Sequence, residues 1–362
     1  MASVQDIRSD KKKVMAQLPA RAFSVSGAAS VSERYALELE SLDPVAEIVE
    51  IQADSPEAFA EAAREADALM VSWGIRIDET IIERLEKCVV IGVGSVGVDM
   101  VDIEAATEAG IVVTNVPDVF IEEVADHTMM LLLAAGRRVR LMGNLVAGDC
   151  WHQGRPLLDK VPRLMGRTLG LLAFGNVARC MARRARAFGL QVIAHDPYVG
   201  ELTMSEAGVE PVSFQELLER SDYLSVHVPL NGETRHLLNA AAFARMKPSA
   251  VLINTARGGI VREADLIDAL RQGSIAAAGL DVLEQEPPAP DNPLIGMENV
   301  VLTPHVASAS TRMRPETRRR VGREVARVLQ GRWPMSCVNP TVLPRVPLER
   351  WQPYPMNRGP NR

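Results

Sequence analysis

The segment Leu169–Tyr198 constrains the fold of this chain more than any other stretch of its sequence. An apolar run at Leu169–Phe174 has the length and composition of a buried parallel strand. Beyond a turn of small residues, apolar positions about four residues apart predict a helix, which Gly189 ends. A second apolar run, Leu190–Ala194, leads to the acidic residue Asp196. The segment therefore predicts a strand, a helix and a second strand of a parallel α/β sheet.

The turn after the first strand has the composition of a dinucleotide-binding turn. Ala173, Gly175 and Ala178 are small, so a pyrophosphate can approach the backbone and the N–H groups that begin the helix. Asp196 lies about 20 residues beyond Gly175, where an acid can accept hydrogen bonds from ribose hydroxyls. Because a carboxylate there repels a ribose phosphate, NAD is favoured over NADP. Ala173 stands at the first glycine of the G-x-G-x-x-G/A pattern, where its methyl group crowds the turn, and a plain crossover unit is the alternative interpretation.

A second glycine-rich run, Gly92-Val-Gly94-Ser-Val-Gly97, matches the same pattern literally. The strand that follows it, Gly110–Thr114, ends without an acid, and the helix between them begins late, near Asp102. We therefore place the dinucleotide at the later segment. The run at 92–97 still lies at the carboxyl end of a strand, where open α/β sheets bind ligands, and its N–H groups could hold a substrate carboxylate. A tight turn without a ligand is an equally weighted alternative.

Bulk properties narrow the class of protein. A chain of 362 residues is long enough for two domains, and 47% hydrophobic with 24% charged residues is ordinary for a globular protein. A net charge of −6 argues against nucleic acid as a partner, and no apolar stretch predicts a membrane span. Four scattered cysteines without a C-x-x-C pair favour a reduced, cytoplasmic chain, and we predict no bound metal.

Alternating strands and helices predict a mostly parallel sheet on both sides of the dinucleotide unit. Residues Met1–Ala20 are polar and expected to be loose, with a first strand at Arg21–Val25. One long helix is expected over Ile121–Val146, followed by an irregular arm over Gly148–Arg163, and the proline-rich tail Pro340–Arg362 is expected to be extended or disordered. Further strands are expected at 68–72, 88–91, 110–114, 223–228, 251–255, 277–282 and 300–303, and further helices at 32–41, 56–65, 78–85, 263–272 and 315–330.

Three residues with catalytic chemistry stand at or just past strand ends beyond the dinucleotide unit: Arg257, Glu286 and His305. Strand carboxyl ends converge on the ligand crevice of this architecture, so the three could meet there. Each also has an ordinary explanation, as a loop charge, a solvated turn acid and a hydrogen-bonded loop histidine. Their spacing alone leaves both explanations open.

The order of several short sequence motifs distinguishes the catalytic interpretation of these residues from the ordinary one. The phrases that follow the dinucleotide turn are His195-Asp-Pro-Tyr198, Asn254-Thr-Ala-Arg-Gly-Gly259, Asp281-Val-Leu-Glu-Gln-Glu-Pro287 and Thr303-Pro-His305. Together they resemble the D-isomer-specific 2-hydroxyacid dehydrogenase family, and Gly92–Asp102 and Asn115-Val-Pro-Asp118 match its pattern as well. The resemblance covers roughly Ser72–Pro340, and the nearest branches are the phosphoglycerate dehydrogenase-like reductases and the C-terminal-binding proteins.

The resemblance implies a role for each catalytic residue. Arg257 is expected to bind the substrate carboxylate and carbonyl through its planar fork, and His305 to protonate the carbonyl oxygen during reduction. Glu286 is expected to hydrogen-bond His305 and to favour its charged form. The backbone N–H groups of Ser95, Val96 and Gly97 are expected to meet the substrate carboxylate. The residues implied in cofactor binding are Ala173, Gly175, Asn176, Val177, Asp196, Pro229, Thr234, Thr255, Ala256, Arg257, Asp281 (near the nicotinamide amide) and His305.

The resemblance also implies the domain plan. A Rossmann NAD-binding domain, 118–305, is inserted into a flavodoxin-like substrate domain made of 1–117 and 306–340, with a tail at 341–362. Closure about the two crossings would exclude water from the hydride path. The long helix after Pro117 and the arm around Trp151 resemble the family's homodimer surface.

Four features depart from the family pattern. Ala173 replaces a glycine, and Asn176 stands where a basic residue is common, which bears on cofactor affinity. Met100 stands where asparagine is usual, and Gly94-Ser95 differs from the usual loop, which bears on the substrate.

Three functions therefore compete. The first is NAD-dependent hydride transfer between nicotinamide and a small D-2-hydroxy acid or 2-oxo acid. The second is an NAD(H)-sensing binding protein of the C-terminal-binding protein type. The third is oxidation of another small anion such as phosphite, since Glu286 disfavours formate.

Overall fold

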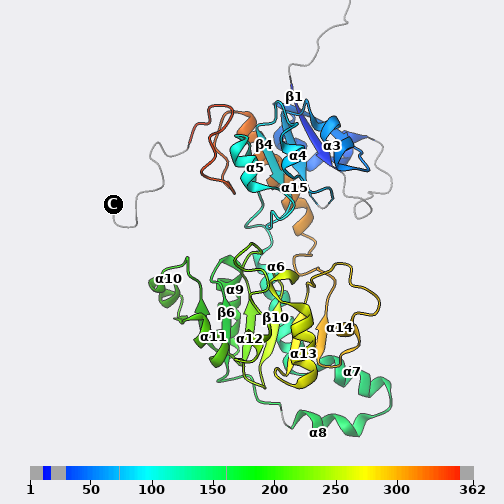
Figure 1. Cartoon of the computed structure of the whole chain (residues 1–362), viewed down its shortest axis with the longest axis vertical. Helices are drawn as coiled ribbons and strands as arrows, with labels where there is room; N and C mark the ends of the chain where they lie inside the picture. Colours follow the sequence, from blue (N-terminus) through cyan, green and yellow to red (C-terminus); the bar gives the residue numbers. More distant parts are fainter. Residues whose placement is uncertain (1–10, 18–29, 73, 160, 351–362) are drawn as a thin grey trace, which may run out of the picture. The chain divides into compact units, whose positions relative to one another are not determined.

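The structure is a computed structural model that describes residues 11–17, 30–72, 74–159 and 161–350. The chain divides into two compact units, one formed by Met1–Val119 with Thr311–Arg362 and the other by Phe120–Ser310 (Figure 1). These boundaries fall a few residues after the ones that the resemblance implies. The first strand expected at Arg21–Val25 lies outside the described residues.

The unit Phe120–Ser310 is built on a seven-stranded parallel sheet in the order β12-β11-β10-β9-β6-β7-β8. The order reverses between β6 and β9, which is the switch point where open α/β sheets bind ligands. The strands are β6 Thr168–Leu172, β7 Gln191–His195, β8 Glu210–Pro211, β9 Tyr223–Val226, β10 Val251–Asn254, β11 Ala277–Leu280 and β12 Val300–Leu302.

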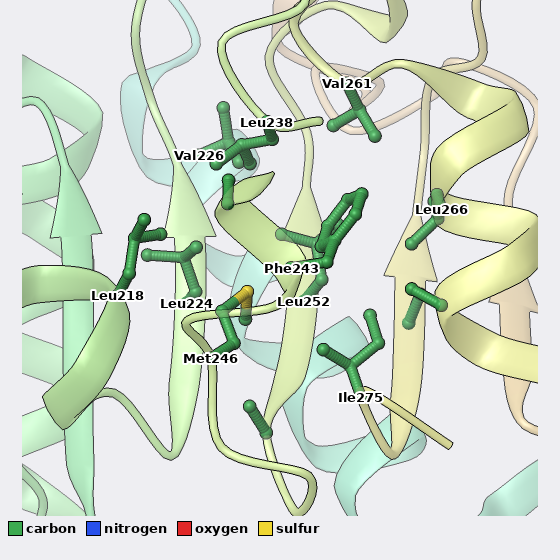
Figure 2. Close-up of a cluster of buried hydrophobic side chains, with 14 of the residues drawn as sticks. Leu218, Leu224, Val226, Leu238, Phe243, Met246, Leu252, Val261, Leu266 and Ile275 are labelled. Atoms are coloured by element: carbon green, nitrogen blue, oxygen red, sulfur yellow. The ribbon is translucent and has the colours of Figure 1, made fainter. Parts of the chain in front are cut away.

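Helices cover both faces of this sheet, as the near-continuous apolar strands require. Alternate residues of β9 face opposite cores: Leu224 packs in one cluster and Tyr223 in the other. Figure 2 shows the first cluster, in which Phe243 lies next to Leu252, with Leu224 on one side and Leu266 on the other. Its helices are α11 Phe214–Arg220, α12 Ala240–Phe243 and α13 Glu263–Gln272; the opposite face carries α6 Ile121–Gly136, α9 Asn176–Ala187 and α10 Glu201–Glu206, and α14 Pro293–Gly296 precedes β12.

The single helix expected over Ile121–Val146 is wrong, because the structure has two. The first, α6, ends at Gly136, and Arg138 takes a left-handed φ of 54° before α7 Val139–Ala147. A side chain at Gly136 would come within 3.0 Å of the Tyr223 ring, so α6 ends packed closely on the sheet. The apolar periodicity continues through the break and could not reveal it. The arm that follows contains η1 Trp151–Gln153 and α8 Gly154–Leu158.

The other unit has a five-stranded parallel sheet in the order β2-β1-β3-β4-β5, which is the flavodoxin-like order that the resemblance implies. Its strands are β1 Lys12–Gln17, β2 Ala46–Ile51, β3 Ala68–Val71, β4 Val90–Val93 and β5 Val112–Thr114. Its helices are α1 Val31–Arg34, α2 Ala36–Leu42, α3 Pro56–Ala63, α4 Glu79–Ile82, α5 Ile103–Glu108 and α15 Met313–Leu329.

Strand β1 corrects the expectation of a loose N-terminus. It pairs with β2 on one side and β3 on the other. Val14, Met15 and Ala16 are buried, while the Lys12 ammonium donates to the Leu329 carbonyl at the end of α15 at 2.8 Å. The exposed lysines at its start hid this strand, because the buried apolar run behind them, Val14–Ala16, is only three residues long. Strand β2 was also missed.

The C-terminal segment differs from the expected tail. Val342 is buried, and the Arg345 guanidinium donates to the carbonyls of Leu85, Cys88 and Ala109 at 2.5, 3.1 and 2.6 Å. Residues 341–350 therefore pack on the first unit, and 351–362 lie outside the described residues. Among the described residues, none of the helices combines the length and apolar character that crossing a bilayer requires.

Replacing Arg345 with alanine should destabilise the unit that contains it. Three backbone carbonyls would lose their donor, so we expect a loss of about 1–3 kcal/mol in the free energy of unfolding. Arg323→Ala, an exposed arginine on α15, is the matched control and should change stability by less than about 0.5 kcal/mol. Chemical denaturation measures both, and equal stabilities would contradict the assigned role of the segment.

Gly258 allows the loop after β10 to touch the loop after β11. A Cβ at this position would lie 1.9 Å from the carbonyl carbon of Leu283, whereas at Gly259 it would meet the flexible side chains of Leu230 at 3.3 Å and Arg235 at 3.6 Å. Gly258→Ala should therefore lower the free energy of unfolding by about 3 kcal/mol or more, and Gly259→Ala by about 1 kcal/mol at most. Thermal unfolding of the two variants provides the comparison; a tolerated Gly258→Ala would mean that these loops do not approach so closely.

Candidate active site

The loops after β10, β11 and β12 carry Arg257, Glu286 and His305 at one edge of the seven-stranded sheet. Asn254, the last residue of β10, fixes the first loop by donating to the Arg257 carbonyl at 2.9 Å and accepting from the Ala256 N–H at 3.0 Å. Arg257 then precedes the short helix η2 Gly258–Ile260. The strand ends therefore bring residues from three separate parts of the sequence to one place.

His305 and Glu286 form a direct pair. The Nδ1 atom of His305 lies 2.6 Å from Oε2 of Glu286, and both side chains are about one-quarter to one-third exposed, at 26% and 32%. The other carboxylate oxygen of Glu286 accepts from the Leu283 N–H at 3.0 Å. With both oxygens bound, the carboxylate is fixed against the Nδ1 side of the ring, so proton exchange with a ligand is directed to Nε2.

Electrostatics connects Arg257 to this pair. Burial by itself raises the pKa of Glu286, but the hydrogen bonds from His305 and Leu283 and the positive charges of His305 and Arg257 outweigh it, so that the pKa lies below its usual value. Glu286 is therefore ionised at neutral pH. His305 contacts this carboxylate directly, and the positive charge of Arg257 acts on it from the neighbouring loop.

Asp281 organises the turn that presents His305. Its buried carboxylate accepts from the Thr303 hydroxyl at 2.5 Å and from the N–H groups of Val306 and Ala307 at 3.0 and 2.8 Å. Its own carbonyl accepts from the His305 N–H at 2.8 Å. These bonds hold His305 at a left-handed φ of 54°. The expected contact of Asp281 with the nicotinamide amide stays a prediction.

Two residues of α6 that the sequence analysis missed support these loops. Thr303 donates its only hydroxyl proton to Asp281, so its oxygen accepts from Nε2 of His127 at 2.8 Å, which fixes the tautomer of that ring. Thr128 likewise donates to the Val124 carbonyl and accepts from the Thr255 hydroxyl at 2.8 Å. Helical periodicity marks α6 only as a packing helix, and no local pattern indicates these contacts.

The turn before α9 fits a pyrophosphate. Gly175 has an ordinary φ of −76°, and a Cβ added to it would meet no heavy atom within 4 Å. Neither the backbone nor the packing of this chain therefore requires glycine at this position, whereas the close approach of a phosphate does. The helix has no side-chain cap, so the N–H groups of Asn176 and Val177 face the same space.

Ala173 is strained at the first fingerprint position. It is buried with a φ of 80°, a conformation that glycine adopts at no cost and alanine does not, and its N–H donates to the His195 carbonyl at 2.8 Å. The Ala173 methyl group, which we expected to crowd the turn, therefore stands on a strained backbone. Arg179, also missed, donates to the Phe174 carbonyl at 3.3 Å and brings a positive charge to the turn that Asn176 does not supply.

Asp196 ties this turn to the end of β7. One carboxylate oxygen accepts from the Phe174 N–H at 2.9 Å and the other from the Tyr198 N–H at 2.8 Å. Each oxygen keeps a further lone pair, so the carboxylate can still accept a hydrogen bond from a ribose hydroxyl. The Tyr198 hydroxyl donates to Glu233 at 2.8 Å, joining this loop to the one after β9.

The remaining predicted residues occupy two places. Pro229 and Thr234 lie in the loop after β9, where the Thr234 hydroxyl donates to the Pro229 carbonyl at 2.6 Å. Ser95, Val96 and Gly97 follow β4 in the other unit, where the Ser95 hydroxyl donates to the Gly97 carbonyl at 2.6 Å. In the described parts of the chain, no group of three or more His, Cys, Asp or Glu side chains is arranged to hold a metal ion.

Known proteins resemble the chain over most of its length. Residues 129–307 match the family model described as the NAD binding domain of D-isomer specific 2-hydroxyacid dehydrogenases. The chain is 39% identical over 290 residues to the glyoxylate reductase of Korarchaeum cryptofilum, covering 80% of the chain and 87% of the relative. It is 38% identical over 315 residues to the D-3-phosphoglycerate dehydrogenase of Methanocaldococcus jannaschii, covering 86% of the chain but only 59% of that relative.

A solved structure agrees with these relatives. The NADPH-dependent glyoxylate/hydroxypyruvate reductase of Sinorhizobium meliloti, determined with NADP and malonate, is 31% identical with a TM-score of 0.76 and covers 92% of this chain and 99% of that one. At the level of the family, the comparisons confirm the predicted fold class, a nicotinamide cofactor and oxidoreduction of 2-hydroxy acids. The chain belongs to the D-isomer specific 2-hydroxyacid dehydrogenase family.

Proposed function

We propose that this chain interconverts a small D-2-hydroxy acid and its 2-oxo acid with NAD as the cofactor. The observation that carries the proposal is the 2.6 Å pair of His305 and Glu286 within the electrostatic reach of Arg257. A guanidinium to hold a carboxylate and an imidazole to exchange a proton are the two groups that this reaction requires. The glyoxylate reductase relative supports a small 2-oxo acid as the substrate.

Each residue of the site has a step in the proposed mechanism. Arg257 binds the carboxylate and the carbonyl oxygen of the 2-oxo acid through its fork of donors, which orients the carbonyl carbon. His305, protonated and facing the carbonyl oxygen through Nε2, donates its proton as negative charge develops there. Glu286 holds the ring and stabilises its charged form. The nicotinamide, when bound, supplies the hydride in this direction and accepts it in the other.

For the cofactor, we assign the pyrophosphate to Gly175, Asn176 and Val177, with Ala173 shaping the turn. Asp196 is assigned to the ribose, and its negative charge favours NAD over the NADP that the Sinorhizobium meliloti relative binds. Pro229, Thr234, Thr255, Ala256 and Asp281 complete the assigned cofactor residues, and Ser95, Val96 and Gly97 the assigned carboxylate site.

We also propose a cytoplasmic homodimer. The α7 to α8 arm exposes Val139, Val146 and Leu157, and Trp151 is 71% exposed, so an apolar surface remains for a second copy. Free Cys88, Cys150, Cys180 and Cys337 suit a reducing compartment.

One observation favours a second candidate function, an NAD(H)-sensing binding protein. The left-handed Ala173 strains the cofactor turn, and a sensor needs binding and release rather than rapid turnover. A partner captured equally with and without NADH would argue against sensing. Oxidation of another small anion, such as phosphite, is tested by including that anion among the substrates.

A substrate panel tests the proposed activity. Purified protein with NADH should reduce glyoxylate, hydroxypyruvate or another small 2-oxo acid, as followed by the loss of NADH absorbance. His305→Gln should lower kcat by about 100-fold or more, because it removes the proton donor, while NADH binding measured by fluorescence is retained. Bound NADH without turnover of any panel member would refute the dehydrogenase function and favour the sensor.

The pH dependence tests Glu286. Its pKa is below the usual value, so its negative charge is present throughout the neutral range and favours the protonated imidazole. Glu286→Gln keeps an acceptor but removes the charge, so reduction, which needs the protonated ring, should fall off at a lower pH than in the wild type. Oxidation, which needs the neutral ring, should extend to lower pH in the same variant.

Glu284→Gln is the matched control for this experiment. Glu284 lies on the same loop as Glu286, but it pairs with His236 and does not contact His305. Its pH profile should coincide with that of the wild type. An unchanged profile for Glu286→Gln would remove Glu286 from its assigned role.

A further inference from the structure

In the loop after β4, three successive carbonyls are bonded within their own unit. The Ser95 carbonyl accepts from the Val116 N–H at 3.0 Å, the Val96 carbonyl from Nδ2 of Asn115 at 2.7 Å, and the Gly97 carbonyl from the Ser95 hydroxyl at 2.6 Å. Within the described residues, the N–H groups of Ser95, Val96 and Gly97 have no acceptor. Successive N–H groups left open in this way form an anion-binding concavity.

We propose that Asn115 and Ser336 are positioning residues that set the shape of this loop and thereby the affinity for the substrate carboxylate. This inference rests on the proposed function, because it takes the open N–H groups as the carboxylate site. Neither residue is expected to touch the substrate; both act through the Val96 carbonyl.

The contacts form a continuous chain from the helix α15 to the loop. Asn115, just past β5, donates to Val96, and the Ser336 hydroxyl donates to Oδ1 of Asn115. Ser336 is itself held by Glu324 of α15, whose fully buried carboxylate accepts from the N–H groups of Met335 and Ser336 at 2.7 and 3.3 Å. Arg320, with its Nε 3.0 Å from the same carboxylate, balances the buried charge.

Ser336 anchors the far side of the Asn115 amide. The Val96 carbonyl can only accept, so it requires the amide nitrogen on its own side and leaves the amide oxygen facing Ser336. The Ser336 hydroxyl donates to that oxygen and holds the amide in place. Without the hydroxyl the amide keeps one anchor in place of two and can rotate away from the Val96 carbonyl, so the tether of the loop is weakened. A residue more than two hundred positions away thus sets the loop conformation.

Kinetics of Asn115→Ala and Ser336→Ala test the proposal. Loss of one hydrogen bond that shapes the carboxylate site should raise KM for the 2-oxo acid about five- to tenfold, with kcat and the Kd for NADH within about twofold of the wild type. Ser336→Thr keeps the hydroxyl and should restore KM. If Asn115→Ala fails to fold, the Ser336 pair carries the test alone.

Amide exchange supplies a readout that needs no turnover. The Val116 N–H bonds the Ser95 carbonyl, so it should exchange faster with solvent when Ser336→Ala loosens the loop. The matched control is Asn339→Ala, which breaks bonds to Val113, Ile111 and Thr107 in the same unit without touching the loop. It should lower Tm while leaving KM and Val116 exchange unchanged.

The outcomes separate the two proposals. An active wild type with unchanged KM and unchanged Val116 exchange in Ser336→Ala overturns the positioning role and leaves the proposed function standing. A wild type that reduces no 2-oxo acid overturns the function and with it the carboxylate assignment. In that case faster Val116 exchange in Ser336→Ala still supports the tether, and unchanged exchange overturns it.

Discussion

The geometry of the candidate active site depends on one buried carboxylate, that of Asp281. It accepts a hydroxyl and two backbone N–H groups from the turn after β12, and its carbonyl holds the N–H of His305. A buried charge is tolerated only when it is hydrogen-bonded, so this requirement fixes the turn. His305 is thereby held in a left-handed conformation, facing Glu286. The geometry of the His305–Glu286 pair thus follows from the hydrogen bonds that the buried Asp281 carboxylate requires.

The same logic extends along α6. His127 and Thr128 are neighbours in sequence, yet they bind two different loops, the one after β12 and the one after β10. A single rigid helix therefore fixes the positions of both loops relative to each other, which preorganises the groups assigned to acid–base chemistry and to the cofactor. Cys180, Arg183 and Arg184 of α9 contact α6 through Glu122, which links the cofactor turn to that frame.

The sequence predicts those features of the fold and the site that depend on residues close together in the chain, and it misses those that depend on distant residues. All strands of the seven-stranded sheet except the short β8, helix Glu263–Gln272, and the positions of Arg257, Glu286 and His305 just past strand ends were predictable, because apolar runs and strand-end positions are local patterns. Strand β1 was missed since its lysines mask a short buried core, and the break at Arg138 was missed since periodicity runs through it. His127, Thr128 and the contact of Ser336 with Asn115 join residues far apart in the chain, and no pattern of residue types announces them.

The two hydrogen bonds of Asp196 have a consequence for redesign of this enzyme family member. The carboxylate assigned to the ribose also receives the N–H of Phe174, within the turn that faces the pyrophosphate. Under this assignment, cofactor specificity and turn geometry depend on the same side chain. Exchanging it for a neutral or basic residue to admit a phosphorylated ribose also removes an acceptor that shapes the phosphate turn, so affinity for either dinucleotide falls unless the replacement, such as asparagine or serine, still offers an oxygen to that N–H.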